Sequence, residues 1–528
     1  MIEINEDSMS PHSNLKSAVC AFHQKKFGEV LLIVENLLEL FEEEDAAGLP
    51  LEIRLKILHL AADAQLSRRE PAMAVLILEK MNKIINEAEN WMTDSQKRWK
   101  NRVNALYCRS YLFPTEIGES RLKQPSSKDI KTLTKSSTYL SMFAKAAFEL
   151  NRNNDIKAMK ILNSEPIVES RAEAAELRES CKTMYYTNQG IIFHRMHKHL
   201  LAASSFKKAL EDHDAVYSQL PRSDVDAYDK KDLRATLIMN IAVSKLYQGK
   251  CEEAFRLFMK ASEALYDQPS IWYRLAECCI AHKQETLKED KQVITEIGEG
   301  CARLAIADHK TQSIEPDQPD DKPRLSYCFA YKCLQNALSY YPTTKTPTMS
   351  QDEVKVMHRM NSTILVTLGF VCLRLGKFSE AIGYTNQSIE KYPDHGYNYF
   401  ANLYKAEALM ELNEMSEACT VFKKAISHAQ DALKWMNIDS WSQNPMNVTC
   451  PRSVQQAKVL ASSNLAAAYC VDGDYNRASE QLAKVREAIP PELISPKTLL
   501  LAVYILLKKG DRQKALSILR TGNILLFN

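Results

Sequence analysis

The stretch Tyr185–Leu210, YYTNQGIIFHRMHKHLLAASSFKKAL, has the residue spacing of two short helices folded against each other. Gly190 is small enough to admit a neighbouring helix, and Phe193 follows one turn later on the same face. Residues 197–199 mark a bend. Small and aromatic residues then recur at three- and four-residue spacing, at Ala202, Phe206 and Ala209. One such hairpin cannot bury its apolar face alone, so the pattern predicts further copies.

Small and aromatic residues at the same offsets recur in five later segments. They are Ala242, Ala254, Phe258 and Ala261; Gly369 and Ala381; Ala406, Ala418 and Phe422; Ala466, Tyr469 and Ala478; and Val503 with Ala515. Two of the separations between the small residues of successive first helices are close to about 34 residues, the period of the tetratricopeptide repeat. The pattern therefore predicts an all-α fold, a right-handed tetratricopeptide superhelix of about seven to nine helical hairpins with irregular loops.

The composition agrees with such a helical array. A chain of 528 residues is too long for one compact core, so it must form several domains or a solenoid. The 14 glycines are less than half the average usage of about 7%, which disfavours strand-rich folds with glycine-bearing turns. The net charge of +2 gives the chain no overall attraction to nucleic acid or to an anionic membrane, and we expect no membrane partner.

The 13 cysteines are odd in number and form no CxxC pair, which favours buried, reduced thiols in an intracellular protein. The first residues, MIEINEDSMSPHS, are acidic and polar and lack the features of a signal peptide. We therefore expect a cytoplasmic location, with the nucleus left open as a second compartment.

Breaks in the helical pattern divide the chain into eight segments. Loops interrupt the stack where proline, glycine and polar residues gather. The predicted segments are a disordered leader at 1–13, degenerate helical repeats at 14–111, a loop or hinge at 112–137, tetratricopeptide repeats at 138–281, a partly helical insertion with an acidic, proline-bearing loop (311–323) at 282–350, further repeats at 351–435, a loop at 436–452, and C-terminal repeats at 453–528.

Motifs for catalysis or cofactor binding are not found. His194, His197 and His199 lack an adjacent carboxylate or cysteine that would complete a zinc site, so we interpret them as turn residues. Residues 298–300, Gly-Glu-Gly, resemble part of a phosphate loop, but the sequence predicts no strand before them and has no GK[ST] after them. HExxH, GxSxG, HRD and DFG patterns are absent from the sequence. We expect a non-enzyme with no catalytic residues, no cofactor and no metal site.

Three asparagines are candidates for contacting a partner. Asn188, Asn240 and Asn464 each lie two residues before the small residue of a first helix, an offset that points toward the inner surface of a stack. An amide there can hydrogen-bond the backbone of a bound segment through both its carbonyl and its NH₂ group. The alternative is that asparagine only tolerates a semi-polar helix surface. The remaining first helices carry other residues at this offset, namely Arg274, Thr367, Tyr404 and Leu501.

Several segments resemble a particular family more closely than they resemble the repeat consensus. They include NQGIIFHRMHKHLLAASSFKKAL (188–210), NIAVSKLYQGKCEEAFRLFMKA (240–261), PSIWYRLAECCIA (269–281), CLQNAL (333–338), SSNLAAAYCVDGDYNRASEQL (462–482) and LLLAVYILLKKGDRQKALSIL (499–519). These segments resemble subunit 10 of the carbon catabolite repression 4–negative on TATA-less (Ccr–Not) complex, the eukaryotic mRNA deadenylase assembly. The resemblance extends from Tyr185 to the C-terminus and is weaker before it.

The resemblance implies a non-catalytic scaffold that supports mRNA decay, translational repression and RNA-mediated gene silencing. It also implies two partners, subunit 11 and the N-terminal region of the large scaffold subunit. Two alternatives remain open. A direct RNA-binding solenoid is disfavoured by the low net charge and scattered lysines, and a peptide-binding co-chaperone adaptor by the lack of a basic clamp for a terminal carboxylate.

Overall fold

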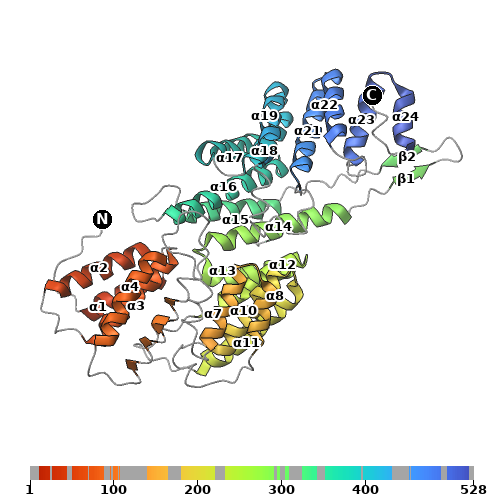
Figure 1. The fold of residues 1–528 in the computed structure, drawn as a ribbon. Coiled ribbons are helices and arrows are strands. Elements are labelled where there is room, and N and C mark those ends of the chain that lie inside the picture. Colours follow the sequence, from red (N-terminus) through yellow and green to blue (C-terminus); the bar gives the residue numbers. More distant parts are fainter. Residues whose placement is uncertain are drawn as a thin grey trace. The chain divides into compact units, whose positions relative to one another are not determined.

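A computed structural model describes most of the chain as helices (Figure 1). The residues described are 11–23, 26–43, 50–68, 71–87, 95–96, 99–100, 102–104, 106–107, 139–164, 180–219, 232–289, 294–297, 304–307, 324–341, 351–393, 397–430, 451, 453–488 and 496–521. The predicted loop at 112–137 and the acidic loop at 311–323 lie outside these residues, as does the loop at 436–452 except Pro451. Helix α1 begins at Pro11, inside the segment predicted to be a disordered leader.

The chain divides into two compact units, Met1–Ser244 with Thr344–Val356, and Lys245–Thr343 with Met357–Asn528. Two of the three boundaries fall within helices α12 and α16, and the third, between Thr343 and Thr344, lies outside the described residues. The first unit contains nine described helices; all but the last of them pack as consecutive antiparallel pairs, and α10 also contacts α7 and α8. These helices are α1 (Pro11–His23), α2 (Phe27–Glu43), α3 (Leu51–Ser67), α4 (Pro71–Glu87), α7 (Tyr139–Asn151), α8 (Asp155–Leu162), α10 (Cys181–Arg195), α11 (His199–Gln219) and most of α12 (Arg234–Tyr247).

The second unit is built in the same way, and four of its second helices contact the first helix of the next pair: α13 contacts α14, α17 contacts α18, α19 contacts α21 and α22 contacts α23. Its helices are α13 (Cys251–Leu265), α14 (Pro269–Glu289), α15 (Tyr327–Tyr340), most of α16 (Gln351–Arg374), α17 (Phe378–Lys391), α18 (Asn398–Glu411), α19 (Met415–Ser427), α21 (Val454–Val471), α22 (Tyr475–Ala488), α23 (Pro496–Lys508) and α24 (Arg512–Thr521).

Seven of the turns between consecutive helices share one geometry. In each, a residue just beyond the first helix has a positive φ between 57° and 86°, at Asn153, His197, Gly249, Gly376, Asn413, Gly473 and Gly510. The N–H of the following residue donates to the carbonyl five residues earlier at 2.9–3.1 Å, as from Lys198 to Phe193. This bond and the left-handed residue form a Schellman C-cap, which ends the first helix and reverses the chain at once.

The same turn fixes where the second helix begins and which residue faces inward. The carbonyl of the residue after the left-handed one accepts the N–H of an alanine four positions later, at 2.9–3.2 Å. These alanines are at most 1% exposed: Ala158, Ala202, Ala254, Ala381, Ala418, Ala478 and Ala515. Each of these alanines lies twelve residues after the mark position of its first helix. The turn therefore fixes how the second helix is aligned with the first.

Among the described residues, nine helix pairs pack as hairpins, within the range of about seven to nine that the sequence predicts. They are α1–α2, α3–α4, α7–α8, α10–α11, α14–α15, α16–α17, α18–α19, α21–α22 and α23–α24. The repeat fold itself is confirmed. The pair α14–α15 was the least apparent from sequence, because the helix at 327–340 falls within the predicted insertion yet packs on α14 across it.

A two-stranded antiparallel sheet lies in this insertion, and the sequence did not predict it. Strand β1 (Ile294–Ile297) pairs with β2 (Leu304–Ala307), with Ile294 opposite Ala307. The prediction that no strand precedes Gly298 is therefore wrong. A phosphate loop still does not follow, because that motif leads from a strand into a helix and β1 leads into β2.

Within the described residues, one stretch of helix α16, Val354–Arg374, is long and apolar enough to cross a membrane, but 67% of its most apolar window is buried in the fold. Gly369 on this helix faces Thr385 of α17, and the Ser362 and Ser388 hydroxyls of the same two helices lie 3.0 Å apart. These contacts are those of a core helix of the repeat stack.

Candidate protein-interaction surface

Nearly all the residues predicted to pack the repeats are buried in the described structure. Phe193 is the exception, because it is half-buried while the adjacent Ile192 is 2% exposed. Ile192 packs with Met142, Phe143, Ala158 and Leu162 of α7 and α8. The sequence assigned the inward position to the aromatic residue, whereas the contact with the preceding hairpin is made by the isoleucine.

The residues that lie two positions before the small residue of each first helix occupy equivalent positions in their hairpins. All seven side chains at this offset are half-buried, so each combines a packed side with an accessible one: Asn188, Asn240, Arg274, Thr367, Tyr404, Asn464 and Leu501. The first two residues lie in the first unit and the other five in the second. We call these seven residues the inner row.

Asn464 has a partner within the chain. Its Nδ2 donates to Oε1 of Glu407 on α18 at 3.2 Å. Burial raises the pKa of the Glu407 carboxyl, and the charge of Arg374 and the Asn464 hydrogen bond oppose this shift only in part. One N–H of the Asn464 amide is therefore committed to the half-buried Glu407 carboxyl, and its second N–H and its carbonyl remain for a partner.

Other members of the inner row are also held by neighbours. The Arg274 guanidinium donates to Oε2 of the buried Glu277 at 2.6 Å. Thr367 Oγ1 donates to the Thr363 carbonyl of its own helix at 2.8 Å. The Tyr404 ring contacts the Phe370 and Phe400 rings at centroid distances of 5.4 and 6.3 Å. These residues present fixed side chains, which a partner would meet without reordering them.

In the first unit, the start of α10 is fixed by Asp212 on α11. Oδ2 of Asp212 accepts hydrogen bonds from Ser180 Oγ at 2.5 Å and Thr183 Oγ1 at 2.6 Å. Ser180 is also the N-cap of α10, since its Oγ accepts the Thr183 N–H. One carboxylate thus holds the cap and the first turn of the helix that carries Asn188.

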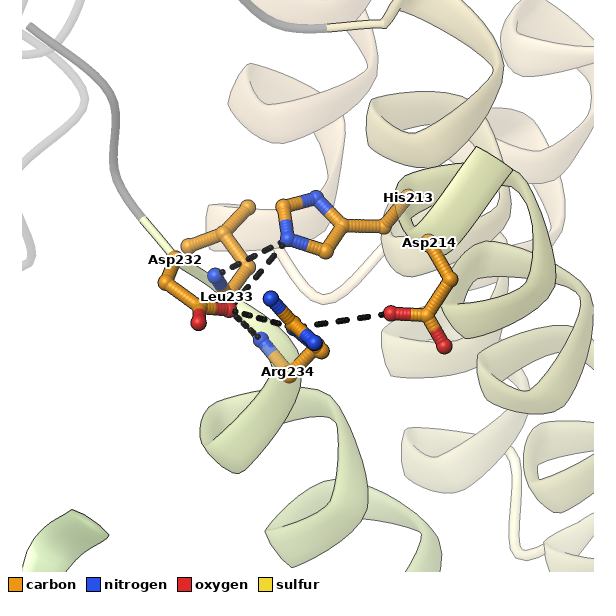
Figure 2. A network of polar contacts seen from close by, with 5 residues as sticks. All are labelled: His213, Asp214, Asp232, Leu233 and Arg234. Carbon is orange, nitrogen blue, oxygen red and sulfur yellow. Dashed lines mark hydrogen bonds and ion pairs between the residues drawn. The ribbon is translucent and has the colours of Figure 1, made fainter. Parts of the chain in front are cut away.

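The next two residues of α11 fix the start of α12, the helix that carries Asn240. Figure 2 shows His213 and Asp214 reaching the segment Asp232–Arg234. His213 Nε2 accepts the Leu233 N–H at 3.3 Å and lies 3.4 Å from Asp232 Oδ1. Asp232 Oδ1 accepts the Arg234 N–H at 3.0 Å, and Arg234 Nε lies 3.5 Å from Asp214 Oδ1.

Asp212, His213 and Asp214 together form what we call the clamp, and sequence reasoning missed it. Its residues follow one another on α11, yet they bond to Ser180, 32 residues before Asp212, and to Leu233, 20 residues after His213. The only local signal was the run Asp-His-Asp near the end of a second helix. The clamp fixes the starts of α10 and α12 relative to α11. It therefore also positions Asn188 on α10 and Asn240 on α12.

The histidines at the bend contact one another. Nδ1 of His194 lies 3.2 Å from Nδ1 of His199, and burial together with His197 lowers the pKa of His199. Among the residues that the structure describes, no three His, Cys, Asp or Glu side chains are placed to hold a metal ion. His197 itself has a φ of 57°, so it occupies the left-handed position of the turn.

Fold and repeat geometry define the chain as an all-α tetratricopeptide-repeat protein. Residues 359–513 match the family model described as the CNOT10 tetratricopeptide repeat domain. The chain is 26% identical over 502 residues to CCR4-NOT transcription complex subunit 10-B of Xenopus laevis, covering 81% of this chain and 66% of that protein. It is 25% identical over 509 residues to subunit 10 of Danio rerio, covering 81% and 80%.

These matches confirm the resemblance to subunit 10 of the Ccr–Not complex. The chain spans slightly less than two thirds of the length of the Xenopus relative. A solved tetratricopeptide repeat protein from Parabacteroides merdae is also similar, with a TM-score of 0.38, 14% identity, and coverage of 63% of this chain and 89% of that one.

Proposed function

We propose that this chain is a non-catalytic scaffold subunit of an mRNA deadenylase complex, supporting mRNA decay and translational repression by binding other subunits. The observation that carries the proposal is the match to subunit 10 relatives over 81% of the chain. The geometry supports it, because rigid repeated hairpins with half-buried, fixed side chains suit binding of an extended or helical segment. The partners we propose are subunit 11 and the N-terminal region of the large scaffold subunit. We place the complex in the cytoplasm, with the nucleus as a second site.

The test is affinity purification of the tagged full chain from a eukaryotic lysate, with mass spectrometry of the proteins retained. We expect subunit 11 and the large scaffold subunit to co-purify, and to do so after nuclease treatment. Loss of both on nuclease treatment would instead support the alternative of direct RNA binding. Recovery of neither subunit from untreated native extract would contradict the proposed function.

The inner row gives a sharper version of this test. Asn188→Ala with Asn240→Ala removes two amides whose side chains are half-buried on α10 and α12. If they contact a partner backbone, subunit recovery falls about tenfold, as at binding hot spots, while the melting temperature stays nearly unchanged. For comparison, Asn464→Ala leaves the half-buried Glu407 carboxyl without this donor and should lower the melting temperature, whatever its effect on binding. If the double variant lost binding and stability to the same extent, Asn188 and Asn240 would have a structural role rather than a role in partner contact.

A further inference from the structure

The last described hairpin exposes a cluster of large apolar side chains. Five of the sixteen exposed large hydrophobic residues within the described chain lie on α23 and α24: Leu500 (62% exposed), Tyr504 (43%), Leu507 (52%), Leu516 (52%) and Leu519 (57%). Their spacing places the first three on one face of α23 and the last two on one face of α24. The buried residues of α23, among them Ala502 and Ile505, lie on its opposite face. We call these five residues the terminal apolar face.

The repeat geometry shows what kind of element covers such positions. Leu519 follows Ala515 by four residues, and the equivalent residues upstream are Leu162, Phe206, Phe258, Thr385, Phe422 and Leu482. All six are at most 3% exposed, whereas Leu519 is 57% exposed. Phe206 and Thr385 pack against Gly190 and Gly369 of the first helix of their own hairpin. Leu162 also shares a buried cluster with Ile192 of α10, and α19 and α22 likewise contact the first helix of the next hairpin. The position is therefore buried between its own first helix and the first helix of the next hairpin, and in the last described hairpin only α23 is present.

Charge indicates the composition of the helix that would fit. The last hairpin, residues 496–521, carries six basic side chains and the single acid Asp511, a net charge of +5. The basic residues are Lys497, Lys508, Lys509, Arg512, Lys514 and Arg520. Two such faces from two copies of the chain would bring like charges together, which disfavours self-association. Residues 522–528, GNILLFN, contain no acidic side chain that could balance the charge.

We infer that the terminal apolar face is a docking surface for an acidic amphipathic helix of a partner protein. The apolar stripe of the partner helix lies on Leu500, Leu507, Leu516 and Leu519. It occupies the position that the first helix of the next hairpin has in the upstream repeats. Its flanking carboxylates face the basic residues of the hairpin, which set the charge preference and speed association. This surface is defined by its own geometry, so the inference stands without the proposed function.

The direct test measures binding of the full chain to a fluorescein-labelled helical peptide of about 20 residues, with leucines at three- and four-residue spacing and glutamates elsewhere. A matched peptide carries lysines in place of the glutamates. We expect the acidic peptide to bind more tightly than the basic one by at least tenfold, and to weaken as salt is added. Equal affinity for both peptides, or binding of neither, would overturn the inference.

Variants locate the binding site. Leu516→Ser with Leu519→Ser should weaken acidic-peptide binding at least tenfold with an unchanged melting temperature, because both side chains are more than half exposed. The control pair Leu32→Ser and Leu76→Ser alters residues that are 55% and 53% exposed on α2 and α4, and should leave the affinity unchanged. Arg512→Glu with Lys509→Glu should reduce both the affinity and its salt dependence.

Two further measurements distinguish other occupants. Sedimentation velocity that shows a dimer dispersed by Leu516→Ser with Leu519→Ser would assign the face to a second copy and overturn the inference. Acidic-peptide binding that appears only after deletion of residues 522–528 would assign the face to the chain's own end, with the same consequence. A monomer that binds the acidic peptide with or without those residues supports it.

Discussion

Gly190 shows how a single missing methyl group sets the closeness of two helices. A Cβ placed on Gly190 would lie 2.6–2.8 Å from three ring carbons of Phe206, a distance that real Cβ atoms essentially never show. The ring belongs to the second helix of the same hairpin and is 3% exposed, so it has no free space to enter. The glycine is therefore required by the aromatic residue that lies across from it.

Gly190→Ala should destabilise the first unit by about 1–3 kcal/mol, the usual cost of overpacking a tight core. The measurement is urea unfolding followed by circular dichroism. The matched control is Gly383→Ala on the exposed face of α17, where a Cβ would meet nothing within 4 Å. That change should stabilise by up to about 1 kcal/mol, because alanine is the better helix former. If Gly190→Ala were neutral, the close contact with Phe206 would be wrong.

Glu407 provides a second prediction at the residue scale, in its dependence on pH. Burial raises the pKa of its carboxyl, so the native state holds this proton more tightly than the unfolded chain does. The group therefore costs stability at high pH, and the cost disappears as pH falls through the native pKa toward the ordinary value. Glu407→Gln, which still accepts from Asn464, should raise the melting temperature by a few degrees at pH 8, and the gain should shrink toward pH 4.5.

Glu253 is the matched control for the opposite sign. The hydrogen bond from Lys245 lowers the pKa of its carboxyl, so its contribution to stability is present at neutral pH and lost in acid. Glu253→Gln should give no gain at pH 8, and at most a slight loss, because the pair is close to solvent. A pH-independent gain for Glu407→Gln would show that packing rather than ionisation is responsible.

At the scale of elements, the clamp on α11 joins hairpins that the repeat pattern alone leaves loosely defined. The Schellman turns align the two helices inside a hairpin, but the connections between hairpins vary in length. His213 and Asp214 bridge the connection from α11 to α12, through contacts with Leu233 and Arg234. Asp212 instead ties the end of α11 to the start of α10 within the same hairpin. The polar end of α11 thus helps to fix both its own hairpin and the start of the helix that follows.

Asp212→Ala should destabilise the first unit by about 1–3 kcal/mol, because it leaves the buried Ser180 and Thr183 hydroxyls without their shared acceptor. Chemical denaturation measures the loss, and hydrogen exchange at the first turn of α10 should rise with it. Asp214→Ala is the control, since its pair with Arg234 is about half exposed and should contribute about 0–1 kcal/mol. Equal effects from the two variants would contradict the specific role of Asp212.

At the scale of the whole molecule, the sequence predicts best what the backbone geometry demands. Gly249, Gly376, Gly473 and Gly510 are visible as turns because a left-handed φ favours glycine, and the buried alanines lie at a fixed distance from them. Asn153 occupies the same left-handed position, and Ala158 follows it by the same offset as in the other turns. The sequence predicted that hairpin but did not single out this alanine, because asparagine marks the turn less clearly than glycine does.

Contacts between segments far apart in the chain could not be predicted. The α14–α15 hairpin is closed over a long insertion, so no local spacing links Trp272 to the helix at 327–340. The partner of Asn464 is 57 residues away, and those of Asp212 are 29 and 32 residues away. Side-chain bonds of this kind depend on the folded arrangement of helices, whereas the repeat pattern depends only on neighbours along the chain.

The division into two compact units predicts how the molecule unfolds. In repeat proteins stability is approximately a sum of nearest-neighbour terms, so long arrays depart from a single all-or-none transition. Gly190→Ala in the first unit and Phe422→Ala in the second, where Phe422 is fully buried, should therefore lower different calorimetric transitions. The Phe422→Ala loss should be the larger, about 3–5 kcal/mol, because it leaves a cavity in the core. If both variants lowered one common transition to the same relative extent, the two units would unfold as a single cooperative body.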